Sequence, residues 1–115
     1  MKNNHINYIE LYANNIEHIK DFYTTCFDWE FTDYGPDYVA FSNSGLAGGF
    51  EKTDKKIVNG ALVVLFYKDL NKIQQKIIEA GGAISKAIFS FPGGRRLHFM
   101  DPDGNELAVW SDILE

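Results

Sequence analysis

The hydrophobic pattern of the chain occurs twice. A β-rich run over residues 6–13 leads to Asn15, and a similar run over residues 60–68 leads to Asp69. Asn and Asp are favourable N-caps, because their side-chain oxygens accept the free backbone N–H groups of a first helical turn. After each cap, apolar residues recur at helical spacing: Ile16, Ile19, Phe22, Tyr23 and Cys26 in the first segment, and Leu70, Ile73, Ile77 and Ala80 in the second. The pattern predicts a strand and then a helix in each half.

Each predicted helix is followed by three short strand-like runs. Turn-forming residues separate them, since Gly supplies positive φ, Pro presets φ, and Asn and Asp hydrogen-bond locally. The runs are residues 29–32, 38–41 and 46–50 in the first half, and 83–89, 95–100 and 106–110 in the second. The sequence therefore predicts an α+β fold made of two tandem βαβββ units.

A four-stranded sheet with one helix has a face that the helix does not cover. Two such units are expected to pair about a pseudo-twofold axis, so that two mixed sheets enclose a shared cleft. We expect one domain over residues 1–115, with unit 1 at about 5–51, a polar linker at about 52–59 and unit 2 at about 60–112.

Composition narrows the function classes. The 115 residues include 45% hydrophobic and 23% charged residues, typical of a globular domain, and the net charge of −5 disfavours nucleic acid and anionic membranes as partners. A single cysteine excludes an internal disulfide. The chain starts without an apolar leader, and no run approaches the ~20 apolar residues of a membrane span, so a cytoplasmic location is expected.

The motifs together resemble the vicinal oxygen chelate superfamily, which includes glyoxalase I, bleomycin- and fosfomycin-resistance proteins and extradiol dioxygenases. They lie in family order over nearly the whole chain: residues 15–23 with the Phe22-Tyr23 pair, residues 27–31, residues 80–82, and the turn Asp101-Pro102-Asp103-Gly104-Asn105. The resemblance implies the paired βαβββ fold and, for many members, a homodimer. It does not decide the activity, because the superfamily contains enzymes and plain binding proteins.

The resemblance also implies where a metal ion would be held in metal-dependent members. These positions correspond to Tyr8, Leu62 and Ala108, with a fourth near residues 48–50. Leu and Ala cannot coordinate a cation, and a neutral phenol is a poor ligand. We therefore expect no metal and no other cofactor.

Alternation along the strands predicts which side chains face the cleft. On the first strand Tyr8, Glu10 and Tyr12 share the face away from the helix. Glu10 is then an acid, a base or a hydrogen-bond acceptor, or it is a solvent-exposed edge residue.

In the run over residues 95–100, Arg96 and His98 share one face and the resemblance places both in the cavity. A guanidinium holds a carboxylate or phosphate in two hydrogen bonds, and imidazole suits proton transfer near neutral pH. Val64, Phe66 and Trp110 are expected to add an apolar and aromatic wall, which suits a small, partly apolar organic ligand.

Three functions follow from these residues. The first is a metal-free protein that binds a small molecule. The second is a cofactor-free lyase or isomerase, in which Glu10 and His98 form an acid–base pair and Arg96 stabilises negative charge. The third is a dimeric interaction module with a vestigial cleft. We expect Glu10, Arg96 and His98 to project into one cleft together with Tyr8, Tyr12 and Trp110.

Overall fold

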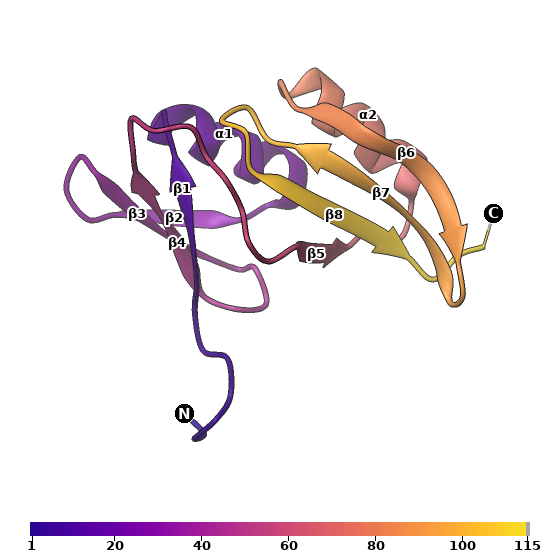
Figure 1. Cartoon of the computed structure of the whole chain (residues 1–115), viewed down its shortest axis with the longest axis horizontal. Helices are drawn as coiled ribbons and strands as arrows, with labels where there is room; N and C mark the ends of the chain where they lie inside the picture. Colours follow the sequence, from indigo (N-terminus) through magenta and orange to yellow (C-terminus); the bar gives the residue numbers. More distant parts are fainter. Residues whose placement is uncertain (115) are drawn as a thin grey trace.

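The computed structural model describes residues 1–114 and contains two βαβββ units in tandem (Figure 1). The first unit consists of β1 (Ile9–Ala13), α1 (Ile16–Phe27), β2 (Glu30–Asp33), β3 (Tyr38–Ser42) and β4 (Gly48–Lys52). The second consists of β5 (Val63–Phe66), α2 (Leu70–Glu79), β6 (Ala83–Phe91), β7 (Gly94–Met100) and β8 (Glu106–Ser111). This order confirms the predicted repeat and the α+β fold.

The helices begin where the sequence predicts. The Asn15 side chain accepts a hydrogen bond from the backbone N–H of His18 at 3.2 Å, and the Asp69 side chain accepts one from Lys72 at 3.1 Å. Each cap satisfies an N–H group that has no partner inside the helix. The strand before each cap, β1 or β5, occupies the same place in its own unit.

Each unit forms one mixed sheet with the same strand order. Sheet A has the order β1-β4-β3-β2, and sheet B has the order β5-β8-β7-β6. In each sheet the unit's first and last strands pair in parallel, and the other neighbours pair antiparallel. Glu10 pairs with Gly49 in sheet A, and Val64 pairs with Ala108 in sheet B. These two pairs are equivalent, because Glu10 and Val64 each lie five residues before their N-cap.

One hydrophobic core joins both units. It lies between the two sheets and the two helices, which run along the same side of the molecule (Figure 1). The Phe99 ring of sheet B lies 6.0 Å from the Phe22 ring and 5.9 Å from the Phe27 ring, both on α1. In the first unit, Tyr23 stacks on Trp29 at 4.6 Å between ring centroids. Burial of these aromatic side chains on one side leaves the opposite face of each sheet uncovered.

The turn over residues 101–105 links the two units through hydrogen bonds. The Asp103 carboxylate accepts hydrogen bonds from the backbone N–H groups of Asn14 and Asn15, both at 2.6 Å. The Asn105 side chain donates to the backbone oxygen of Tyr12 at 2.7 Å. Asp101 is 4% exposed, and burial raises its pKa although it accepts four hydrogen bonds. This turn, one of the motifs that carry the family resemblance, therefore has a structural role.

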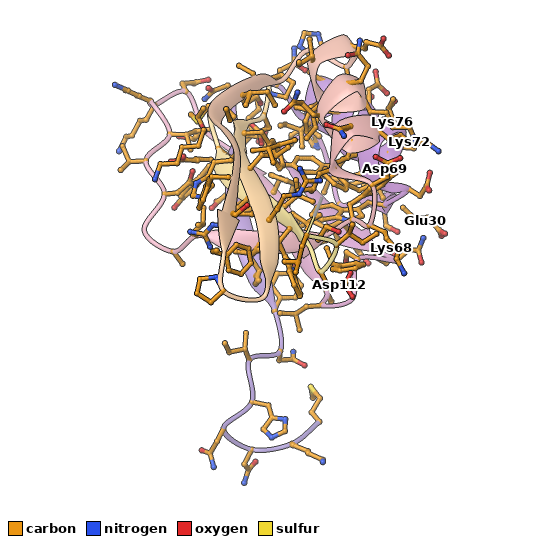
Figure 2. All side chains as sticks on the ribbon, turned by 90° about the vertical axis from the view of Figure 1, so that its right-hand side faces the viewer. Glu30, Lys68, Asp69, Lys72, Lys76 and Asp112 are labelled. Carbon is orange, nitrogen blue, oxygen red and sulfur yellow. The ribbon has the colours of Figure 1, made fainter. Side chains whose placement is uncertain are left out.

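The N-terminal segment before β1 projects away from the rest of the molecule in both views (Figures 1 and 2). Its apolar residues gain little from folding, since Ile6 is 78% exposed. Within residues 1–114, no helix is both long enough and apolar enough to cross a membrane.

Candidate functional site

Each sheet has a face that points away from the helices, here called its open face. In sheet A, Leu11 is buried on the helix side, whereas Tyr8 and Tyr12 are 42% and 46% exposed. In sheet B, Val64 and Phe66 are 44% and 51% exposed. Strand alternation explains both patterns, because successive side chains point to opposite faces. The aromatic and polar side chains predicted for the cleft therefore stand on the open faces.

The open face of sheet A carries a string of three hydrogen-bonded groups. The Tyr38 hydroxyl donates to Glu10 Oε1 at 2.9 Å and is also hydrogen-bonded to the Tyr8 hydroxyl. Burial and these two hydrogen bonds raise the pKa of Tyr38 well above its ordinary value. Gly49 lies beneath the phenols, and a Cβ there would come within 2.3 Å of the Tyr38 oxygen. We call Tyr8, Tyr38 and Glu10 the acceptor string.

The open face of sheet B holds an arginine among aromatic rings. The Arg96 guanidinium carbon lies 5.3 Å from the centre of the Phe89 ring and 5.7 Å from that of Phe91. Trp110 continues this wall, with its ring 6.2 Å from Phe91 and 5.2 Å from Phe66. Arg96 Nε is buried and has no hydrogen-bond partner among residues 1–114. The guanidinium has no salt bridge within these residues, so it retains hydrogen-bonding capacity for a ligand.

His98 lies on the same open face and is 6% exposed. Its Nδ1 is 3.5 Å from Glu106 Oε2, which also accepts a hydrogen bond of 3.1 Å from the Ser85 hydroxyl. The other ring nitrogen, Nε2, is buried without a partner within the described part of the chain. A carboxylate near Nδ1 favours the tautomer in which Nδ1 carries the proton and Nε2 accepts one. The pair can therefore act as a hydrogen-bond acceptor or as a base.

Irregular pairing of β6 brings further side chains to this face. Its register against β7 shifts between Ile84 and Lys86 and again between Lys86 and Phe89. These irregularities redirect side chains along β6, and Phe89 comes to lie 6.0 Å from the His98 ring. The β7–β8 pairing is regular over residues 95–100, so Arg96 and His98 keep the face that alternation predicts.

The three predicted polar residues fall on two different open faces. Glu10 contacts Tyr38 in sheet A, whereas His98 contacts Glu106 in sheet B. Within residues 1–114 of one chain, no hydrogen bond or salt bridge joins Glu10 to Arg96 or His98. Sequence reasoning missed Tyr38, Ser85, Glu106, Phe89 and Phe91. Strand alternation predicts that the Tyr38 side chain points to the face opposite the buried Val39. Its contact with Glu10 could not be predicted, because it depends on the order of the strands in the sheet.

The resemblance assigns four positions to metal ligands, and the strand register narrows the one near residues 48–50. Tyr8, Leu62 and Ala108 are three of them, and the equivalence of the Glu10–Gly49 and Val64–Ala108 pairs makes Gly49 the fourth. Only the phenol of Tyr8 carries a donor atom, and it is engaged with Tyr38. This donor set does not fit a divalent ion. Residues 1–114 also contain no group of three or more His, Cys, Asp or Glu side chains suited to hold one.

A cleft of about 680 Å³ lies between the edge strands β1 and β5. Ile9 and Leu11 line it from β1, and all of β5 lines it from the other side. Its volume falls in the range of small-molecule pockets. Because β1 and β5 are the edge strands of their sheets, the cleft lies along one edge of each sheet.

The chain is therefore a protein of two βαβββ units with a cleft large enough for a small molecule. The model of the glyoxalase/bleomycin resistance protein/dioxygenase superfamily matches residues 5–109, and the chain belongs to this superfamily. This confirms the family resemblance of the sequence motifs. The search of curated proteins found no match.

Solved structures share the fold at low sequence identity. A glyoxalase/bleomycin resistance protein/dioxygenase family enzyme from Burkholderia phytofirmans PsJN superposes with a TM-score of 0.80 at 15% identity, covering 92% of this chain and 97% of that one. A glyoxalase-related enzyme from Fulvimarina pelagi gives 0.79 at 16% identity, covering 94% and 88%.

A third similar structure is the E126Q mutant of the fosfomycin resistance protein FosX from Listeria monocytogenes. It gives a TM-score of 0.80 at 17% identity, covering 94% of this chain and 90% of that one. That protein was crystallised with Mn(II) and 1S,2S-dihydroxypropylphosphonic acid. At these identities the similarity establishes the fold, and the function has to be argued from this chain's own residues.

Proposed function

We propose that the protein binds a small, partly apolar organic molecule on its open faces, with Arg96 as the contact for an anionic group. Arg96 carries this proposal. Its guanidinium lies over two phenylalanine rings, and it has no salt bridge among residues 1–114. Because no carboxylate of these residues pairs with the guanidinium, a ligand carboxylate or phosphonate can form bidentate hydrogen bonds with it. The rings of Phe66 and Trp110 provide an apolar wall for the rest of the ligand.

Binding is proposed to need no metal. The support is the donor chemistry of Tyr8, Gly49, Leu62 and Ala108, which stand where the family's metal-dependent members hold their ion. A chelator such as EDTA should leave the melting temperature and the ligand affinity of the purified protein unchanged. One equivalent of tightly held metal per chain, found by elemental analysis, would contradict this.

We also propose that the protein is a homodimer in which the open faces are covered. The open face of sheet A carries the carboxylates of Glu10 and Glu51, and that of sheet B carries Arg96 and Lys86 beside the Glu106–His98 pair. Complementary charge favours sheet A of one copy opposite sheet B of another. A twofold axis would form this contact twice and would bring Glu10 toward Arg96 and His98 of the second copy. Sedimentation at micromolar concentration tests this, and a monomer would contradict it.

The alternative function is a cofactor-free lyase or isomerase. The observation that favours it is the Glu106–His98 pair, in which His98 Nε2 has no hydrogen-bond partner within residues 1–114. In the dimer proposed above, the Glu10 carboxylate would complete the acid–base pair expected from the sequence. If the protein is such an enzyme, it should convert a bound ligand, and His98→Ala should abolish this conversion. If it is a binding protein, the ligand should be recovered unchanged.

A thermal-shift screen tests the main proposal, because a ligand that binds the native state raises the melting temperature. We expect aromatic carboxylates and phosphonates to raise it, while neutral analogues of the same size raise it less. Arg96→Gln should abolish the difference between the two groups. Arg95→Gln is the matched control. Its Nε is likewise buried without a partner among residues 1–114, but Arg95 is the neighbouring residue of β7, so strand alternation turns its side chain to the side of the sheet opposite Arg96. Equal shifts in wild type and Arg96→Gln would refute the assignment.

A further inference from the structure

The direction of the hydrogen bonds in the acceptor string follows from counting protons. A carboxylate only accepts, so Tyr38 donates its single proton to Glu10. Tyr38 therefore accepts from Tyr8, which uses the only phenolic proton of Tyr8. The phenolic protons of Tyr8 and Tyr38 are therefore both used in hydrogen bonds within the acceptor string. What remains toward solvent is acceptor capacity on Glu10 and on the Tyr8 oxygen.

The string keeps this polarity because its central phenol stays protonated. Burial and the hydrogen bonds with Tyr8 and Glu10 raise the pKa of Tyr38. Gly49 also preserves the geometry, because a Cβ at this position would meet the Tyr38 oxygen at 2.3 Å and the Tyr8 oxygen at 2.7 Å.

The surroundings of the string are acidic and aromatic. Glu51 lies across from Tyr12 in the β1–β4 pairing and across from Tyr38 in the β3–β4 pairing, which adds a second carboxylate to the same face. Tyr8 and Tyr12 lie two residues before and two residues after Glu10 in the sequence, and both are nearly half exposed. Phenol rings attract cations through their π-faces. Acceptors, carboxylates and ring faces together select a ligand group that donates protons and carries positive charge.

We propose that the open face of sheet A is a subsite for an organic ammonium group, held by Glu10 between the rings of Tyr8 and Tyr12. The subsite rests on the proposed small-molecule function and names the chemistry of one end of the ligand. In the proposed homodimer, the other end of the ligand would face the rings and guanidinium on sheet B of the second copy. A neutral alcohol offers one proton without charge, and a carboxylate offers none, so both are poorer occupants than an ammonium.

Three probes of the same size test the proposal: benzylammonium, benzyl alcohol and benzoate. Each is titrated into the full-length protein, and backbone amide NMR shifts report both the affinity and the location. We expect benzylammonium to bind about tenfold or more tightly than benzyl alcohol, because only its donor group is itself charged and attracted both to the carboxylate and to the tyrosine rings. The largest shifts should fall in β1 and at residues 38 and 49.

Glu10→Gln keeps the shape of the side chain and removes its charge. It should weaken benzylammonium binding by about tenfold or more and leave benzyl alcohol binding within about twofold. Glu30→Gln is the matched control, since Glu30 is an exposed glutamate on β2, at the margin of the molecule in Figure 2. It should change neither affinity by more than about twofold. Unchanged melting temperatures of both variants show that the fold is intact.

The outcomes separate the two proposals. Benzylammonium that binds no better than benzyl alcohol, that shifts residues outside sheet A, or that binds Glu10→Gln as well as wild type overturns the ammonium subsite. If benzoate binds to the wild type and does not bind to Arg96→Gln, the proposed small-molecule function is supported even though the ammonium subsite is refuted. If none of the three probes binds at millimolar concentration, both proposals are contradicted.

Discussion

Replacing Asn105 by alanine should destabilise the protein strongly, because this side chain holds the two units together. Asn105 is fully buried. Its Nδ2 donates to the backbone oxygen of Tyr12 at 2.7 Å and to Asp101 Oδ2 at 2.9 Å, and its Oδ1 accepts from Asn59 Nδ2 at 2.9 Å. Alanine removes all three hydrogen bonds and leaves their partners behind.

The cost follows from the groups that lose a partner. A buried polar group left without its hydrogen bond costs about 1–3 kcal/mol. Asp101 keeps its bonds to Tyr23 and to backbone N–H groups, and Asn59 keeps its bond to the N–H of Glu106. We therefore count the Tyr12 oxygen fully and the other two groups in part, which gives about 2–5 kcal/mol. For a chain of this size that lowers the melting temperature by roughly 10–20 °C.

Urea unfolding followed by circular dichroism measures this difference in the free energy of unfolding. Asn71→Ala is the control, because Asn71 is exposed on α2 and alanine is the better helix former. It should be neutral or slightly stabilising. The slope of free energy against urea should stay the same in both variants. A loss below about 0.5 kcal/mol in Asn105→Ala would refute the reasoning, since ordinary surface substitutions cost no more.

Three further predictions concern single side chains. Burial raises the pKa of the Cys26 thiol to about 11 from an ordinary 9.0, so the folded protein holds this proton more tightly than the unfolded chain. The free energy of unfolding should therefore fall between pH 9 and 11 in wild type more than in Cys26→Ala, and at pH 9 a thiol reagent should label Cys26 only after urea is added. Gly49→Ala should displace the Tyr38 phenol and lower its pKa toward the ordinary value, as measured by NMR of ¹³C-labelled tyrosine; an unchanged titration would contradict the contact. Glu106→Gln should shift His98 away from the tautomer with the proton on Nδ1, as seen in its ¹⁵N ring shifts, and identical spectra would show that Glu106 does not position His98.

The helices and their faces were predictable because the signals are local. A cap and the next few turns of helix involve residues close together in sequence, and Asn15 and Asp69 cap as expected. Strand alternation is equally local, so the exposure of Tyr8 and Tyr12 followed from the pattern. The partners of Glu10 and His98 were not predictable, since they come from other strands.

The amino-acid sequence by itself determined the order of elements, the repeat, the buried face of each helix and the motif set of the superfamily. Periods of 2 and 3.6 residues encode these features within single segments. Only the tertiary structure decided that Tyr38 meets Glu10 above Gly49, that Glu106 meets His98, and that residues 101–105 clasp the first unit. These contacts depend on strand order, register and the irregular pairing of β6. Register is set by hydrogen bonds between distant segments, and a shift of one residue would turn every side chain to the other face.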